Sequence, residues 1–494
     1  MLSSAALLDG AHASYYAYFL PPGINDRLIK TAVWLAAGAL IAFYTALLHS
    51  LERRRYGWRS RYGLLLLALL SVLAMVERRA AFHPRPAAVP RPAVVEAAER
   101  PQLWVIGLDT ATLDAILPLA GQGRLPFLAR MIQGGAYGRL DSFSPGRPAS
   151  LWMTLATGRY PYQHGVTGGP VFGADHIAHG SELNLLPVGI GFERWGLLGS
   201  GGRLPQSYTR GALALWEVLP RLGISAGMAG WPASSPAGNE DVFVLSDRFF
   251  LVRPEPDSAW PRELAKRPDA LRPDLRQVGA TIRSAFGPMP SKGVADAFTG
   301  DLWRESALSS LLAEHSNPGA VLLVLPGLRH VSRRYFGGFD AVQFRGRQAH
   351  DAEEAAELIA TYYARLDQYL GELWDRGKGP RVLAVVSAFG IEGSFGWRRL
   401  LGEVSRPSAL EGFFDDAPDG ALLLYGEGIR PGTLITGAKI VDLAPTLLYA
   451  LDCPVASDLD GQVLTSAFDK SFLASHPLTV LPSYDALKRA PAPH

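Results

Sequence analysis

The sequence places one acidic residue where α/β proteins build their sites. Asp109 directly follows residues 103–108, a short apolar run that comes after a proline-rich segment. The length and composition of this run are typical of a buried strand. Apolar residues at helical spacing then follow, namely Leu113, Ile116 and Leu117. Because open α/β sheets bind ligands in the crevice outside the carboxyl ends of their strands, the pattern predicts a site at the Asp109 carboxylate.

Three further apolar runs predict strands of the same sheet. They are residues 319–325, 382–386 and 421–425. The clearest helix, residues 353–376, lies between two of them, and its apolar residues form one stripe that indicates core packing. Strands that alternate with helices favour a doubly wound, mostly parallel sheet. We therefore expect an α/β fold.

Two apolar runs near the N-terminus predict transmembrane helices. Residues 31–48 form an uncharged run of 18 residues, close to the roughly 20 that cross a bilayer core. Residues 62–76 form a run of 15, which spans a bilayer only if the arginines at its ends snorkel. The other interpretation of this second run is a buried core helix. A cleaved signal peptide fits poorly, because no positively charged region leads the first run.

The arginines between the two runs predict the orientation. The loop SLERRRYGWRSR contains Arg53, Arg54, Arg55, Arg59 and Arg61. The positive-inside rule places this loop in the cytoplasm. Both termini and the large C-terminal part then lie outside, in the periplasm if the membrane is a bacterial inner membrane.

The expected organisation has five parts. A net charge of +2 gives no case for nucleic acid as a partner, and the single cysteine, Cys453, can form no internal disulfide. The parts are an N-terminal segment (1–28), two transmembrane helices with the arginine-rich loop (29–77), a Pro/Ala-rich linker (78–100), a large α/β domain (101–470) with a cap or lid at about 253–318, and a C-terminal tail (471–494).

Several segments together resemble a known family. They are VIGLDTATLD, RLPFLARMIQGGAYGRL, LWMTLATGRYPYQHGV, ALWEVLPRLGISAGMAGWPASSPAG, VLSDRFF, YYARLDQYLGELWDR and VDLAPTLLYALDCPVASDLDGQVL. In this order they are similar to the type I phosphodiesterase and nucleotide pyrophosphatase branch of the alkaline phosphatase superfamily. The resemblance implies that residues 101–470 form an alkaline-phosphatase-like domain. Active members hydrolyse phosphate esters with a Thr or Ser nucleophile held between two metal ions, commonly zinc, which neutralise charge on the transferring phosphoryl group.

The resemblance keeps one expected metal ligand and loses the nucleophile. The family's first ligand, an Asp at the end of the first strand, falls on Asp109. The nucleophile lies four residues before the aromatic residue matched by Trp152, and so falls on Pro148, which has no hydroxyl. Ser144 and Ser150 are nearby, but either would require a shifted loop.

The other expected ligands are replaced. The family's Asp-x-x-x-His pair falls on Arg329 and Arg333, and its Asp-His pair falls on Ala388 and Phe389. Its last His falls on Asp416. Arginine does not normally bind metals, so the resemblance implies degenerate metal and nucleophile positions.

These replacements are consistent with one another. Arg329 and Arg333 would bring two fixed positive charges to the place of two metal cations, where guanidinium groups are natural partners for the carboxylates of Asp109 and Asp416. Ala388 and Phe389 would fill the vacated space. We expect an internal network of Arg and Asp in place of the metals.

Other interpretations of these residues stay open. Asp109 could form a salt bridge or a helix N-cap, and His330 could rescue a single metal site. Arg147, Arg329 and Arg333 could bind an anion such as phosphate or a lipid headgroup, or form internal ion pairs. His164 is expected to form hydrogen bonds in the core. His176, His179 and His350 lack ligand-like spacing.

Two functions compete on this evidence. The first is a membrane-anchored, catalytically inactive relative of the superfamily, which binds the lipid bilayer and membrane-protein partners as a structural subunit and needs no cofactor. The second is a phosphodiesterase or phosphatase with a rearranged site. That site would use Asp109 and Ser150, with His330 and Asp416, around one zinc or other divalent metal.

Overall fold

The computed structural model describes two compact units. The first consists of helices α1 to α3 with Pro161–Gln163, and the second of the described residues from Arg100 onward other than those three. The described residues are 2–53, 57–77, 100–168, 171–173, 182–184, 210–238, 242–287, 291–315, 318–339, 349–393, 412–414 and 416–487. Several parts of the chain that the sequence singled out lie outside this set. They are the expected linker apart from Arg100, the residues His176 and His179, the side chain of His350 and the end of the tail.

The first unit contains the expected membrane segments. Helix α1 (Leu2–Tyr15) packs against α2 (Pro22–Leu51), and α3 (Trp58–Glu77) follows. Helix α2 contains the first apolar run and is, among the described residues, the one helix long and apolar enough to cross a membrane. The second apolar run lies in α3, whose side chains from residue 71 onward are outside the description. A second membrane span therefore stays a prediction.

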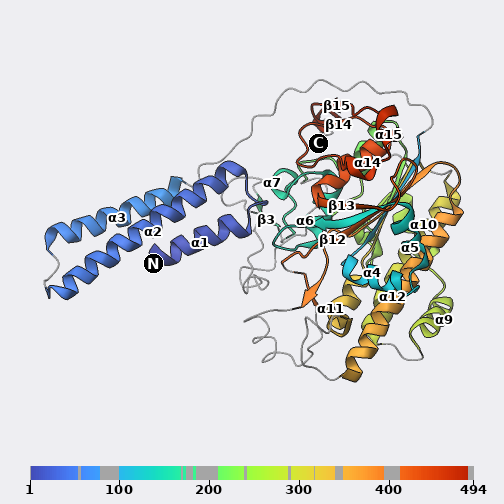
Figure 1. The fold of residues 1–494 in the computed structure, drawn as a ribbon, viewed down its shortest axis with the longest axis horizontal. Helices are drawn as coiled ribbons and strands as arrows, with labels where there is room; N and C mark the ends of the chain where they lie inside the picture. Colours follow the sequence, from blue (N-terminus) through green and yellow to red (C-terminus); the bar gives the residue numbers. More distant parts are fainter. Residues whose placement is uncertain are drawn as a thin grey trace. The chain divides into compact units, whose positions relative to one another are not determined.

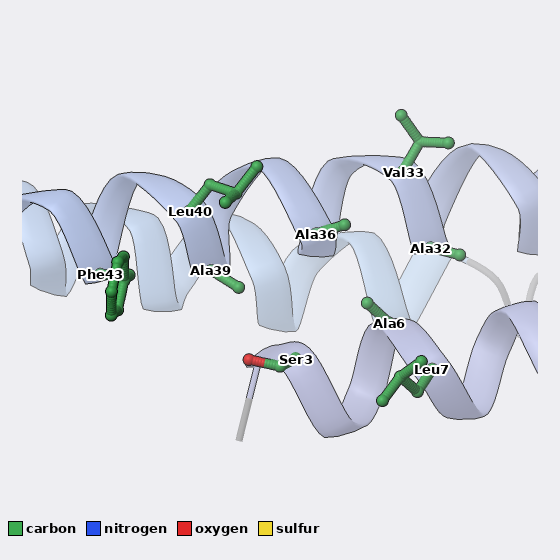
Figure 2. Close-up of a pocket in the computed structure, with 9 residues that line it drawn as sticks. All are labelled: Ser3, Ala6, Leu7, Ala32, Val33, Ala36, Ala39, Leu40 and Phe43. Carbon is green, nitrogen blue, oxygen red and sulfur yellow. The ribbon is translucent and has the colours of Figure 1, made fainter.

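A shallow apolar cleft runs between α1 and α2 (Figure 2). It encloses about 620 Å³ and is lined by Ser3, Ala6 and Leu7 of α1 and by Ala32, Val33, Ala36, Ala39, Leu40 and Phe43 of α2. Figure 2 shows that the alanines of α2 present only methyl groups beside α1. The cleft exists because small side chains leave space between the two helices.

The second unit is built around a nine-stranded sheet in the order β13-β2-β12-β9-β1-β8-β5-β6-β7 (Figure 1). Four of the strands were expected: β1 (Gln102–Leu108), β8 (Ala320–Leu325), β9 (Arg381–Val386) and β12 (Gly420–Gly426). The others are β2 (Ala136–Asp141), β5 (Ala226–Ala229), β6 (Phe243–Leu245), β7 (Ala259–Trp260) and β13 (Thr433–Lys439).

The sheet is mixed but mostly parallel, as expected. Strands β9, β1, β8, β5 and β6 run parallel to one another, and β1 pairs with β8 from Leu103↔Ala320 to Leu108↔Leu325. Strand β12 runs antiparallel to both β9 and β2. Its beginning, not its end, therefore lies at the carboxyl edge of the parallel strands.

Helices cover both faces of the sheet (Figure 1). The larger core lies between one face, with Trp104, Ile106 and Leu108, and helices α4 (Leu113–Gly121), α5 (Pro126–Gly134), α9 (Leu275–Phe286), α10 (Lys292–Glu314), α11 (Gly327–Phe339) and α12 (Ala349–Arg376). Helices α6 (Pro148–Thr157), α8 (Leu215–Arg221) and α14 (Leu443–Ala450) cover the opposite face. Short elements complete the unit: β3 (Val171–Gly173), β4 (Glu182–Asn184), β10 (Glu392–Gly393), β11 (Gly412–Phe413), β14 (Val455–Ala456), β15 (Val480–Leu481) and α15 (Lys470–Ser475). The short helix α7 (Pro161–His164) contains the three residues that belong to the first unit.

Helix α6 lies close against the first strand because Gly107 has no side chain. A Cβ atom on Gly107 would lie 2.5 Å from the Trp152 ring. The Trp152 ring in turn packs edge-on against Trp231, with ring centroids 5.4 Å apart. This close approach holds the start of α6 beside the end of β1.

Residues 253–318, expected as a cap or lid, contribute to the core. Strand β7 pairs with β6 at one end of the main sheet. In α10, the side chains of Ala307, Leu308 and Leu311 are fully buried in the larger core.

The start of α5 depends on a buried carboxylate of α12. The Asp367 side chain, 1% exposed, accepts the backbone N–H groups of Phe127 and Leu128 at 3.1 and 2.7 Å. These are orphan donors in the first turn of the helix.

Replacing Asp367 with Ala will lower the free energy of unfolding by about 1–3 kcal/mol, because it leaves two buried donors unsatisfied. Chemical denaturation of the variant measures this change. Asp375→Ala is the control, since the Asp375 side chain is 74% exposed and its loss should cost less than about 0.5 kcal/mol. Equal costs for the two variants would refute the capping role.

Candidate functional site

The carboxyl ends of adjacent strands bring the expected site residues to one edge of the sheet. Strands β8, β1 and β9 are neighbours and run parallel, so Asp109, the start of α11 and residues 387–389 leave the sheet at the same edge. The turn before β12 also lies there, because β12 is antiparallel to β9. The fold thus gathers the positions that the resemblance assigns to metal ligands.

Asp109 is buried and bonded on both oxygens. Its side chain is 1% exposed, and Oδ1 accepts the Trp152 Nε1–H at 3.0 Å. Arg329 Nη1 lies 3.0 Å from Oδ2, close enough for an ion pair although not aligned as a hydrogen bond. Burial raises the pKa of Asp109, while Arg329, Trp152 and Arg304 oppose this effect. The carboxylate is therefore held by a tryptophan of α6 and an arginine of α11.

The start of α11 is fixed by a buried carboxylate that the sequence did not identify. Asp301 of α10 accepts the Gly327 N–H at 3.0 Å and the Tyr362 hydroxyl at 2.7 Å. A Cβ on Gly327 would lie 1.9 Å from the Tyr362 hydroxyl, so only glycine fits. Burial raises the pKa of Asp301 to about 6. Because Arg329 is two residues beyond Gly327, Asp301 helps to set the position of Arg329.

A partly buried arginine, Arg304, lies near these carboxylates. Arg304 Nη1 donates to the Gly300 carbonyl at 2.9 Å, and its guanidinium lies 4.5 Å from the centre of the Phe250 ring. Burial lowers the pKa of Arg304, whereas the charges of Asp301 and Asp247 raise it. Sequence patterns gave no signal for Arg304, Asp301 or Asp247, because they come together only in the tertiary structure.

The second expected arginine faces outward. Arg333 and His330 are both exposed on α11. Desolvation lowers the pKa of His330 to about 4, with further lowering by Arg329, Arg304 and Arg333. The expectation that Arg333 pairs internally with an Asp is therefore wrong: within the described part of the chain it makes no ion pair. Arg333 lies on the same side of α11 as Arg329, but it is one turn farther from the end of β1 and its side chain is in solvent.

The start of α6 carries the expected nucleophile position. Pro148 is the first residue of α6, after the N-cap residue Arg147. Ser144 Oγ donates to the backbone carbonyl of Asp416 at 3.0 Å. Ser150 is fully buried, and its hydroxyl makes no hydrogen bond in the structure. Ser150, two residues beyond Pro148, thus carries a buried hydroxyl without a hydrogen-bond partner.

Ala388 and Phe389 fill their part of the site with apolar volume. Both are 0% exposed, and the Phe389 ring packs against Phe414 with centroids 5.3 Å apart. This contact closes the space between the ends of β9 and β11.

Asp416 does not join the buried network. Its side chain is exposed, which corrects the expectation of a second buried carboxylate beside Asp109. The next residue, Ala417, has a φ of 49° and is 6% exposed. The turn before β12 therefore directs Ala417 inward, close to Gly146, and Asp416 outward.

His164 forms hydrogen bonds in the core, as expected. Its Nδ1 accepts the Val166 N–H at 3.1 Å, and its Nε2 lies 2.9 Å from the Thr154 hydroxyl. Because Thr154 donates its own proton to the Ser150 carbonyl, Nε2 donates to Thr154. Burial lowers the pKa of His164 to about 3, so the ring is neutral.

The residues at this edge do not fit a two-metal centre. Zinc sites take Cys, His, Asp or Glu ligands, and in the described residues no group of three or more such side chains is placed to hold a metal ion. Asp109 is the one buried carboxylate at an expected ligand position, and Trp152 and Arg329 already bind both of its oxygens.

Replacing Arg329 with Ala will destabilise the protein by about 3 kcal/mol at neutral pH, because Asp109 is then left as a buried charge without its partner. The folded-state pKa of Asp109 is already raised and will rise further in the variant. The folded state therefore holds its proton to higher pH than the unfolded state, and the cost should shrink as the pH falls toward 4.

Denaturation of Arg329→Ala and Arg333→Ala across this pH range measures the effect. Arg333 is exposed, so its removal should change stability by less than about 0.5 kcal/mol. A pH-independent cost for Arg329→Ala, or equal costs for the two variants, would contradict the ion pair.

Comparison with solved structures finds distant likenesses. An alkaline phosphatase, PafA, is 12% identical over 76% of this chain and 100% of that chain, with a TM-score of 0.48. Murine ectonucleotide pyrophosphatase/phosphodiesterase 5, in an inactive variant bound to AMP, is 10% identical over 72% and 95%, with a TM-score of 0.39. Phosphonoacetate hydrolase from Sinorhizobium meliloti is 15% identical over 62% of each chain, with a TM-score of 0.34.

Comparison with sequence families assigns the chain to a family. A search of curated protein sequences gives no match. The sequence model described as type I phosphodiesterase/nucleotide pyrophosphatase matches residues 103–399, which is more than half of the chain and contains Asp109, Arg329 and Phe389. The chain therefore belongs to the type I phosphodiesterase/nucleotide pyrophosphatase family.

Proposed function

We propose that this chain is a membrane-anchored member of its family that does not hydrolyse phosphate esters and serves as a binding or structural subunit of a membrane assembly. The contact between Arg329 and Asp109 carries the proposal. The one retained ligand position is occupied by a guanidinium at 3.0 Å and an indole N–H at 3.0 Å. A divalent cation could bind there only after displacing a fixed positive charge.

The charge of the site supports the same conclusion. A catalytic metal pair must be held by several carboxylates and imidazoles. Here Arg304 and Arg329 lie near Asp109, and both lower its pKa through their charge. Apolar residues occupy the Ala388 and Phe389 positions. Positive charge and apolar volume thus stand where the family's metals and their ligands would be.

The remaining positive charge suits an anion. We propose that Arg147, Arg329 and Arg333 bind a phosphate or a lipid headgroup, because guanidinium groups match the geometry of such groups. Arg329 and Arg333 are one helical turn apart on α11, and Arg329 is 23% exposed. Arg147 is the N-cap of α6, whose free N–H groups also favour an anion.

A second candidate function is a phosphodiesterase with a rearranged site. The observation in its favour is the buried, unpartnered Ser150 hydroxyl in the first turn of α6. Such an enzyme would use Asp109 with His330 and Asp416 around one metal. His330 and Asp416 are both exposed, so the start of helix α11 and the turn before β12 would have to move for these side chains to reach Asp109.

The membrane part of the proposal rests on α2, which is long and apolar enough to span a bilayer. We propose that α2 and α3 cross the inner membrane of a bacterium, with the large domain in the periplasm and a membrane protein as partner. The arginines between the two helices then lie in the cytoplasm, as the positive-inside rule requires.

Elemental analysis of the purified full chain for zinc, manganese and calcium, with turnover of a nitrophenyl phosphodiester, tests the proposed loss of chemistry. We expect less than stoichiometric metal and no turnover above that of Asp109→Asn. Asp114→Asn is the matched control, because Asp114 pairs with Arg139 at the surface. Stoichiometric metal, with turnover that Asp109→Asn abolishes and Asp114→Asn retains, would establish the enzyme instead.

A cysteine introduced at Gly57 tests the topology. Gly57 is exposed between α2 and α3, and the native Cys453 is buried. In intact spheroplasts a membrane-impermeant maleimide should leave Gly57→Cys unlabelled until the cells are lysed. Labelling from the outer side would mean that the orientation is inverted.

A further inference from the structure

Helix α11 has one buried face and one basic face. Leu328, Val331, Ser332 and Phe336 are at most 2% exposed. His330, Arg333 and Arg334 are exposed. Residues three and four apart lie on the same side of a helix, so these three side chains form one surface. We call His330, Arg333 and Arg334 the α11 basic face; Arg329, which turns toward Asp109, lies at its edge.

Among the described residues, no carboxylate pairs with the arginines of the α11 basic face. No ion pair joins Arg333 or Arg334 to a carboxylate in this part of the chain, and the Arg334 guanidinium lies 5.8 Å from the centre of the Tyr335 ring. Several other arginines of the same domain do have such a partner, whereas Arg276 and Arg283 of α9 have no ion pair among the described residues. Each of the following has a carboxylate within 4.0 Å: Arg124, Arg130, Arg139, Arg262, Arg267, Arg272 and Arg376.

Four acidic residues near α11 lie on its other sides. Asp109 and Asp301 are buried beneath the helix and are already bonded to Trp152, Arg329, Gly327 and Tyr362. Glu353 and Glu357 share a cleft with Phe336 of the buried face. The positive charge of His330's neighbours is strong enough to contribute to the lowering of its pKa.

The shape of this face favours an extended anionic surface over a small ligand. The three side chains are exposed on one side of α11, within little more than one helical turn (Figure 1 locates α11). Each arginine held near an anionic lipid surface contributes about 1 kcal/mol of attraction. The same chain carries α2, and residues 78–99 can reach at most about 75 Å when fully extended. A lipid surface is therefore the polyanion that is always within reach.

We propose that the α11 basic face docks the large domain on the anionic lipid headgroups of the membrane that holds α2. This inference rests on the proposed membrane anchoring. Of the two anions proposed above, a phosphate and a lipid headgroup, it assigns the lipid headgroup to Arg333. Arg333 and Arg334 supply the attraction, and Arg329 stays on Asp109.

The test uses the full chain in lipid nanodiscs that contain a photoactivatable lipid headgroup. One set of discs contains phosphatidylcholine alone and the other also contains phosphatidylglycerol. The crosslinked peptides are identified by mass spectrometry. We expect crosslinks on residues 327–339 that depend on phosphatidylglycerol and decrease with added salt.

Two double variants distinguish the loss of the α11 basic face from the loss of the same positive charge elsewhere on the domain. Removal of an arginine near an anionic membrane weakens docking about fivefold, so Arg333→Gln with Arg334→Gln should lower the docking equilibrium about 30-fold. Arg276→Gln with Arg283→Gln is the control, because these arginines are equally exposed on α9 and the same charge is lost. Thermal unfolding checks that both variants fold.

Three results would overturn the inference while α2 stays in the membrane. They are crosslinks whose yield does not depend on lipid charge, equal crosslinking yields in the two double variants, and crosslinking of α11 to a copurifying acidic protein. Alkaline carbonate extraction reports on the anchoring itself. Release of the whole chain by carbonate would overturn the membrane anchoring, and the docking would fall with it.

Discussion

The ion pair between Arg329 and Asp109 is the interaction on which the structure of this edge depends. It joins α11 to the end of β1, and the Trp152 indole joins α6 to the same carboxylate. Two helices on opposite faces of the sheet thus meet at one buried charge. Such a charge is tolerated only when it is paired and hydrogen-bonded. The family places metal cations here, and this chain satisfies the same carboxylate with its own side chains.

The ion pair is supported by a buried polar layer beneath α11. Asp301 accepts the first backbone N–H of the helix and the Tyr362 hydroxyl. The positive charge of Arg304 interacts with the carboxylates of Asp301, Asp247 and Asp109. Farther along α10, Glu305 pairs with Arg365 at 2.7 Å, and burial raises the pKa of Glu305 to about 8. A layer of this kind fixes the rotation of α11 about its axis. That rotation places Leu328, Val331 and Phe336 inward and the α11 basic face outward.

The sequence predicted the strands and the positions of the site better than the partners of the site residues. Residues 103–108, 319–325, 382–386 and 421–425 became β1, β8, β9 and β12 because each is an apolar run of strand length. The antiparallel direction of β12 could not be predicted, since an apolar run reads the same in either direction. Asp416 was misplaced because the local turn, with Ala417 at positive φ, decides which side chain faces inward. Asp301 and Arg304 gave no signal, because their partners are distant in sequence and meet only after folding.

The central claim is that Arg329 holds the Asp109 carboxylate in place of a metal. The most direct measurement is anomalous X-ray diffraction from crystals of the chain grown with zinc. The account predicts that Arg329 lies on Asp109 and that no anomalous peak appears at that carboxylate. A zinc ion about 2.0–2.2 Å from an Asp109 oxygen, with Arg329 turned away, would contradict it.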